Sequence, residues 1–204
     1  ASISILRIAS RSLASWFRIF ASTCFSGAQE LAGRCDVLVT AGGDGTLSDM
    51  INSVDTSRIP IAFLPLGTGN AMRHALKCKG NLADIAVRIR DGHIHEYDLI
   101  NCDERRLAFM ASVGIEGATI LLREKYRSQG ATGLKTYFRA VLNSYFEEYR
   151  RADAKMTLDG TTVEVKGLLS LMVVKQPYYG FGMRVVPKAR FDDRKLHILC
   201  INSG

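Results

Sequence analysis

Long apolar runs, paired cysteines and internal repeats are all missing from this sequence of 204 residues. No apolar run reaches the roughly 18 residues that a membrane-spanning helix needs. The five cysteines are odd in number, widely spaced and without a Cys-x-x-Cys pair, which argues against a disulfide framework or a zinc site. We therefore expect a globular, cytoplasmic protein whose cysteines are reduced.

The composition is ordinary, but the charge is not balanced. Hydrophobic residues make up 47% and charged residues 23% of the chain, as in globular proteins, and the length suits one large domain or two small ones. The net charge of +7 favours an anionic partner: a nucleotide, a nucleic acid or an acidic membrane surface. The same charge would also serve a simple solubilising surface.

One glycine-rich stretch organises the chain. Residues 37–47 read Val-Leu-Val-Thr-Ala-Gly-Gly-Asp-Gly-Thr-Leu, and apolar residues then recur at helical spacing through Val54. This pattern predicts a buried strand, a tight turn and a helix. Glycine lets the backbone approach a ligand closely, and a helix N-terminus presents free N–H groups to phosphate. Asp44 would lie beside a phosphate-bound Mg²⁺ or an attacking hydroxyl; alternatively, it only caps the helix.

A second unit of the same kind follows. Residues 59–64 are typical of a strand, and residues 65–70, Pro-Leu-Gly-Thr-Gly-Asn, form a polar loop before another short helical run. Because ligands bind at the carboxyl edge of a parallel sheet, two such loops at that edge predict a binding site. The alternative is a pair of plain strand–helix turns without a ligand.

These two motifs together resemble the diacylglycerol kinase catalytic domain superfamily, which includes bacterial lipid kinases, sphingosine kinases and ceramide kinases. Residues 42–46, Gly-Gly-Asp-Gly-Thr, also resemble NAD kinases, but those enzymes carry an Asn-Glu or Asn-Asp pair that this sequence lacks. The resemblance implies ATP and Mg²⁺ as cofactors. It makes Asp44 the general base or a metal ligand. It also implies that the nucleotide is bound by Gly42, Gly43, Gly45, Thr46, Gly67, Thr68, Gly69 and Asn70.

The second half of the chain resembles the same family. Residues 112–118 look like its second glycine–acid motif, in which Glu116 would hold the acceptor hydroxyl or the metal. Residues 178–183, 187–189 and 192–193 resemble its Tyr-Gly-Gly-Gly-Met, Pro-x-Ala and Asp-Gly signatures. Phe181 and Arg194 stand where the family has glycine, and Lys175 stands where asparagine is common.

The expected architecture has two parts. Residues 1–95 would form a Rossmann-like α/β domain with a parallel sheet that binds ATP. Residues 96–204 would form a β-sandwich-type lipid-substrate domain with one long helix over residues 132–149. The aromatic face of that helix would be core or an acyl-chain wall, and basic residues around it would suit an anionic bilayer.

Residues 1–29 have no acidic residue and carry three arginines and seven serines. This composition is typical of a targeting presequence or an interfacial helix, or of an ordinary helix that packs on the sheet. The Asn-Pro-containing loop with which the family begins is not found here, and the family normally continues beyond position 204. We therefore expect a core fragment or a shortened member.

The predicted function is an ATP-dependent lipid kinase of phospholipid metabolism that phosphorylates a diacylglycerol-like or sphingoid hydroxyl. The predicted partners are a lipid substrate and the surface of an anionic membrane, without nucleic acid, and a homodimer is allowed. The alternatives are an NAD kinase-like enzyme and a non-catalytic remnant that binds a nucleotide or a lipid.

Overall fold

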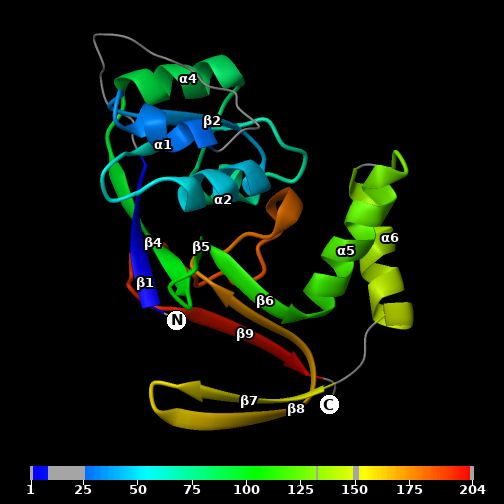
Figure 1. Ribbon diagram of the computed structural model, residues 1–204. Coiled ribbons are helices and arrows are strands. Elements are labelled where there is room, and N and C mark those ends of the chain that lie inside the picture. The colour runs from blue at the N-terminus through cyan, green and yellow to red at the C-terminus, as the bar shows by residue number, and fades with distance from the viewer. Residues whose placement is uncertain (1, 9–25, 132, 149–151, 203–204) are drawn as a thin grey trace. The chain divides into compact units, whose positions relative to one another are not determined.

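The computed structural model of the chain describes residues 2–8, 26–131, 133–148 and 152–202 (Figure 1). It divides into two compact units, Ala1–Phe109 with Lys175–Leu196, and Met110–Val174 with His197–Gly204. This division differs from the predicted boundary near residue 95. The chain continues the first sheet up to Phe109, and the segment 175–196 returns to the first unit before the last strand, at residues 197–202, joins the second.

The first unit contains a five-stranded sheet in the order β2-β3-β1-β4-β5. Its strands are β1 Ser2–Ile8, β2 Leu38–Gly42, β3 Ile61–Pro65, β4 His95–Cys102 and β5 Arg106–Ala108. Strands β2, β3 and β1 run parallel, whereas β4 and β5 pair antiparallel. The predicted parallel sheet is confirmed, and an antiparallel edge is added to it.

The helices that the structure describes in this unit follow the apolar pattern of the sequence. They are α1 Ser26–Ala32, α2 Asp44–Ser53, α3 Ala71–Ala75 and α4 Leu82–Asp91. In α2, Leu47, Met50 and Ile51 are buried in the core. Each such side chain contributes about 1.5–3 kcal/mol when it leaves water. Helix α4 begins with a capping box between Asn81 and Asp84, which satisfies two otherwise unpaired N–H groups.

The second unit is antiparallel and centred on one long strand, β8. It contains β6 Met110–Gly114, β7 Ala152–Leu158, β8 Thr161–Val174 and β9 His197–Asn202. The predicted β-rich unit is confirmed, and the helix expected over residues 132–149 is present at residues 134–148, after a second helix that was not predicted. Two helices, α5 Ile115–Ser128 and α6 Leu134–Asn143, form a hairpin, and a π-helical turn, η1 Ser144–Glu148, follows.

The N-terminal expectation was partly wrong. Residues 2–8 form strand β1, which pairs with β4 along its whole length from Ser2↔Asn101 to Ile8↔His95. Their alternating serine and isoleucine residues suit the two-residue repeat of a strand better than a helical face. The rest of the expected helix, at residues 9–25, lies outside the described residues. No helix that the structure describes is long and apolar enough to cross a bilayer.

A buried ion cluster fastens the returning segment to the first sheet. Lys175 is completely buried, and its Nζ lies 2.9 Å from Asp98 Oδ2 and 2.8 Å from Asp193 Oδ1. The same Nζ donates to the carbonyl of Lys195 at 2.6 Å, and Asp98 Oδ2 also accepts the Arg194 N–H at 2.7 Å. A buried charge is tolerated only when it is paired and hydrogen-bonded, so the lysine fixes strand β4 and residues 193–195 in one arrangement.

Phe181 and Arg194, which stand where the resembled family has glycine, both have a backbone conformation that favours glycine. Phe181 has φ of 59° and Arg194 has φ of 54°, both in the left-handed region. A side chain at such a position costs free energy because its Cβ approaches the neighbouring carbonyl oxygen. The backbone of the returning segment therefore follows a glycine-type path, although the side chains there have changed.

We predict that Lys175→Met lowers the free energy of unfolding by about 3–5 kcal/mol, because it leaves two carboxylates in a buried site without their cation. Urea denaturation measures this change. Lys188→Met, which removes an exposed lysine of the same segment, is the matched control and should stay within about 0.5 kcal/mol of the wild type. A loss below 1 kcal/mol for Lys175→Met would show that the cluster does not hold the segment.

We also predict that Arg194→Gly raises the free energy of unfolding by about 1 kcal/mol, because glycine adopts φ of 54° without the Cβ clash. Lys188→Gly is the control: this lysine lies outside the left-handed region, so glycine there only adds entropy to the unfolded chain. The two variants should shift the urea midpoint in opposite directions. Equal destabilisation by both would contradict the argument.

Candidate functional site

The two glycine loops lie side by side in the first unit, as the sequence predicted for neighbouring parallel strands. The register of β2 and β3 places Gly42 opposite Pro65, at the carboxyl ends of both strands. The carbonyl of Gly42 accepts the N–H groups of Leu66 at 2.8 Å and Gly67 at 3.1 Å. The second loop is therefore hydrogen-bonded to the backbone of the first.

Glycine is required where these backbones touch. A Cβ on Gly43 would lie 3.3 Å from the Cα of Gly67, and a Cβ on Gly67 would lie 2.7 Å from Asn70 Oδ1 and closer still to Gly43. A Cβ on Gly42 would lie 2.6 Å from the Cβ of Thr46. These three glycines allow close packing within the site. Packing within the protein therefore suffices to explain why glycine is needed at these three positions, without any ligand.

Gly45 is different. It is exposed, and a Cβ built on it would meet no other atom within 4 Å. Gly45 and Thr46 lie in the first turn of α2, where backbone N–H groups have no partner inside the helix. The open space above Gly45 and these N–H groups together suit the close approach of a phosphate.

Asp44 joins the two loops. Its Oδ2 accepts the N–H of Ala71 and its Oδ1 accepts the N–H of Met72, both at 2.9 Å. These N–H groups open α3, so the carboxylate caps the helix of the second loop. It does not cap its own helix, whose N-cap residue is Gly43. The half-buried carboxylate is held in one orientation, and each oxygen keeps a lone pair for a further contact.

The residues of the second loop have separate tasks. Asn70 is buried in a left-handed conformation with φ of 36°, and its Nδ2 donates to the carbonyls of Pro65 at 3.3 Å and of Gly67. The carbonyl of Gly69 accepts the N–H of Phe181 at 2.8 Å. Asn70 therefore shapes the loop, and Gly69 connects it to the returning segment. Leu66 and Thr68 are the exposed side chains of this loop, and of the two only Thr68 is polar.

The donor set fits a metal ion that arrives with a nucleotide. Among the described residues, no group of three His, Cys, Asp or Glu side chains could hold a metal by itself. Mg²⁺ commonly keeps several waters and binds one or two carboxylates together with substrate phosphates. Asp44 lies beside the glycine turn that suits phosphate, and its carboxylate can serve as the one protein ligand of such an ion.

Glu116 belongs to the second unit and is not among the residues that the first unit brings together. It lies in the first turn of α5, and its Oε1 accepts a hydrogen bond from the hydroxyl of Ser170. Its Oε2 is buried and has no hydrogen-bond partner among the described residues. A carboxylate that is half paired in this way is held firmly by β8 but keeps one oxygen for another contact.

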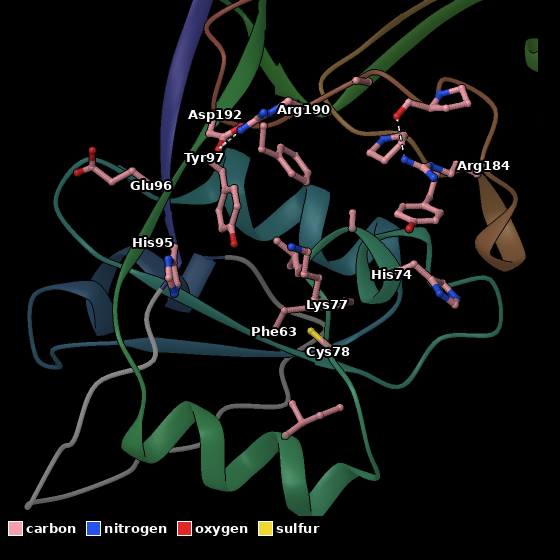
Figure 2. A pocket seen from close by; sticks show the side chains of 18 of the residues that line it. Phe63, His74, Lys77, Cys78, His95, Glu96, Tyr97, Arg184, Arg190 and Asp192 are labelled. Atoms are coloured by element: carbon pink, nitrogen blue, oxygen red, sulfur yellow. Dashed lines mark hydrogen bonds and ion pairs between the residues drawn. The ribbon is translucent and has the colours of Figure 1, made fainter.

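The first unit also contains a cavity of about 960 Å³, which Figure 2 shows. Its lining combines aromatic side chains with charged ones of both signs. The aromatic ones include Phe63, Tyr97 and Phe191, the cationic ones are Lys77, Arg88, Arg184, Lys188 and Arg190, and the acidic ones are Glu96 and Asp192. Burial raises the pKa of the Cys78 thiol and of the Tyr97 hydroxyl above their ordinary values, so both groups are neutral at physiological pH.

This cavity does not include the glycine loops, and the sequence did not predict it. The two features meet at α3: Asp44 binds the N–H groups at its start, whereas His74 and Ala75 near its end line the cavity. The cavity needs residues from β4, α4 and the returning segment, which no local pattern brings together. The available signals were the three stretches that resemble family signatures, because Tyr178, residues 187–189 and Asp192 all line the cavity.

Comparison with known proteins places these features in a family. Residues 14–102 match the model of the diacylglycerol kinase catalytic domain, and residues 110–204 match a model described as the YegS C-terminal NAD kinase beta sandwich-like domain. The chain is 24% identical over 182 residues to a diacylglycerol kinase of Staphylococcus epidermidis, covering 88% of this chain and 57% of that protein. It is 25% identical over 179 residues to a diacylglycerol kinase of Staphylococcus saprophyticus, covering 87% and 58%.

Solved structures show the same fold. The crystal structure of a diacylglycerol kinase from Bacillus anthracis matches with a TM-score of 0.65 at 22% identity, over 87% of this chain and 58% of that one. A second structure from the same organism matches with a TM-score of 0.69 at 21% identity, over 88% and 61%. The chain spans less than two thirds of the length of these relatives. The paired glycine loops, the two family models and the shared fold agree, and the chain belongs to the diacylglycerol kinase catalytic domain superfamily.

Proposed function

We propose that the protein is an ATP-dependent lipid kinase that transfers the γ-phosphate to a lipid hydroxyl of the diacylglycerol or sphingoid type. The observation that carries this proposal is Asp44, whose carboxylate is fixed between two touching glycine loops by the N–H groups of Ala71 and Met72. The names of the matched relatives, diacylglycerol kinases, support the same acceptor class. In this proposal the first unit binds the nucleotide and the second binds the lipid.

Phosphoryl transfer depends on positioning and on the neutralisation of charge more than on covalent help from the protein. The N–H groups of Gly45 and Thr46 would hold the phosphates at the open end of α2, and Thr68 would reach them from the second loop. Mg²⁺, held by the phosphates and Asp44, would supply further neutralisation of the phosphate charge. Gly42, Gly43, Gly67, Gly69 and Asn70 would act indirectly, because they build the shape of the two loops.

Asp44 would accept the proton of the attacking lipid hydroxyl. Its two hydrogen bonds fix the direction of the carboxylate, so no reorientation is needed when the hydroxyl arrives. Glu116 would hold the acceptor hydroxyl through Oε2, while Ser170 keeps the carboxylate in place. The protein would act as a peripheral enzyme at the anionic membrane that contains its substrate.

We predict that Asp44→Asn lowers the rate of phosphoryl transfer by at least about 100-fold, because a positioned general base contributes that much or more. The amide also loses one hydrogen bond to α3, which should lower the free energy of unfolding by only about 1–2 kcal/mol. The assay incubates the protein with ATP, Mg²⁺ and a total lipid extract, and mass spectrometry identifies new phosphorylated lipids.

Asp49→Asn is the matched control, since Asp49 lies on the same helix and pairs with Arg106 at 3.4 Å on the surface. It should keep wild-type turnover. Unchanged turnover of Asp44→Asn would rule out the role of this carboxylate. Tight ATP binding without turnover on any lipid by the wild type would instead indicate the non-catalytic remnant.

We predict a contrast between two glycines. Gly45→Ala should leave the free energy of unfolding unchanged or raise it by up to about 1 kcal/mol, because alanine favours the helix. Its methyl group should nevertheless weaken ATP binding about tenfold or more by filling the phosphate space. Gly67→Ala should instead destabilise the fold, since its Cβ would overlap the backbone of Gly43. Urea denaturation measures the stability of both variants, and calorimetric titration measures their affinity for ATP. If Gly45→Ala bound ATP with wild-type affinity, the phosphates would not lie above Gly45.

An NAD kinase-like activity is the second candidate, since the C-terminal family model carries that relation in its description. The Asn-Glu or Asn-Asp pair of NAD kinases is missing from the sequence. The same incubation with radiolabelled ATP, with NAD added beside the lipid extract, separates the two activities. Label in the organic phase supports the lipid kinase, and label in a water-soluble dinucleotide supports the alternative.

A further inference from the structure

The cavity of the first unit is apolar where its lining is buried and charged where its lining is exposed. The buried residues of the lining are Phe63, Ile85, Ala189 and Phe191. Tyr97 is partly buried, and its ring lies 5.0 Å from the ring of Phe191 in an edge-to-face arrangement (Figure 2). All the lysines and arginines of the lining are exposed. This distribution suits a ligand with an apolar, ring-containing body and a charged end.

The cations of this cavity outnumber its carboxylates. Arg190 is paired with Asp192, whose two oxygens accept from it at 2.9 Å and 3.0 Å. The other acidic side chain of the lining is Glu96. The lining cations that form no ion pair with any carboxylate among the described residues are Lys77, Arg88, Arg184 and Lys188. This excess of positive charge favours an anionic ligand.

Backbone carbonyls hold two of these cations in place. Arg184 Nη2 donates to the carbonyl of Pro187 at 3.0 Å, and Arg88 Nη2 donates to the carbonyl of Lys79. A neutral carbonyl fixes the direction of a guanidinium without cancelling its charge, and each guanidinium keeps further N–H donors. Arginine is the preferred partner of phosphate oxygens, because its planar fork can bind two of them at once.

Lys77 stands where glycine is the favoured residue. It follows Leu76, the C-cap of α3, and has φ of 53°, in the left-handed region. Glycine commonly occupies this position after a helix, and a lysine there is strained because its Cβ approaches a carbonyl oxygen. The same lysine lines the cavity. The chain thus keeps a cation at the cavity although glycine would stabilise the fold, and strain of this kind is typical of functional sites.

We propose that this cavity is a second ligand site, separate from the glycine loops, for a small phosphomonoester with an aromatic body. The ring would lie against the buried apolar lining beside Tyr97 and Phe191, and the phosphate would lie among Lys77, Arg88 and Arg184. A carboxylate fits less well, because it carries one charge, whereas a phosphomonoester carries nearly two at neutral pH. The volume of about 960 Å³ lies in the range of small-molecule sites.

This inference goes beyond the proposed function, and its test needs neither ATP nor lipid. Calorimetric titration of the full chain with phenyl phosphate should give a dissociation constant of about 1 mM or tighter. Inorganic phosphate should bind about tenfold more weakly, because it lacks the ring that the apolar lining would bury. Phenol should also bind about tenfold more weakly, because it lacks the phosphate. No binding of phenyl phosphate, or equal binding of phenyl phosphate and inorganic phosphate, would overturn the proposal.

The variant Lys77→Gly separates binding from folding. Glycine adopts φ of 53° without the Cβ clash, so this variant should raise the urea midpoint. The loss of the ammonium group should nevertheless weaken the binding of phenyl phosphate about tenfold, and Arg184→Gln should weaken it to a similar extent. Lys79→Gln removes an exposed lysine that is not among the lining residues, and as the matched control it should bind within about twofold of the wild type. Wild-type binding by both Lys77→Gly and Arg184→Gln would contradict the proposal.

Two further measurements locate the ligand. Gly45→Ala, which alters the glycine loops, should bind phenyl phosphate as the wild type does; a loss of about tenfold would mean that these loops bind it instead. Cys78 lines the cavity and is partly buried, so phenyl phosphate should slow its alkylation by N-ethylmaleimide several-fold. The exposed Cys200 of the second unit is the internal control and should react at an unchanged rate. Equal rates for Cys78 with and without phenyl phosphate would place the ligand outside the cavity and overturn the proposal.

Discussion

The site depends on the contact between two backbones. Gly43 and Gly67 approach so closely that a side chain on the second would overlap the first, and the carbonyl of Gly42 holds the second loop by two hydrogen bonds. Asp44 then ties the start of α3 to this pair. A glycine turn with free N–H groups and a carboxylate are thus combined in one rigid element. Any reaction at this edge of the sheet would use a carboxylate that is already oriented.

The returning segment extends this rigidity. Lys175 ties it to β4 through the ion pair with Asp98, and the N–H of Phe181 donates to the carbonyl of Gly69 in the second glycine loop. Residues more than a hundred positions apart in the sequence therefore support one loop. The same segment lines the cavity of the first unit through Tyr178 and Phe191. The first unit is consequently not continuous in sequence.

The α5–α6 hairpin differs from the first unit in the side chains that it buries and exposes. In the first unit, Leu47, Ile51 and Ile61 are fully buried, as expected of a protein folded in water. In the α5–α6 hairpin, Ser144 and Thr119 are buried, whereas Phe146 and Leu121 are exposed.

The sequence by itself determined the elements whose causes are local. Apolar spacing predicted α2 and its buried face, and glycines after apolar runs predicted the paired loops. Only the tertiary structure decided that Asp44 binds α3, that Lys175 is buried between Asp98 and Asp193, and that residues 2–8 pair with β4. It also decided which face of α6 is buried, because helical periodicity groups Phe138 with Leu142 but does not say whether that group faces a core. Long-range hydrogen bonds and burial depend on residues that are distant in the chain, and no local pattern contains that information.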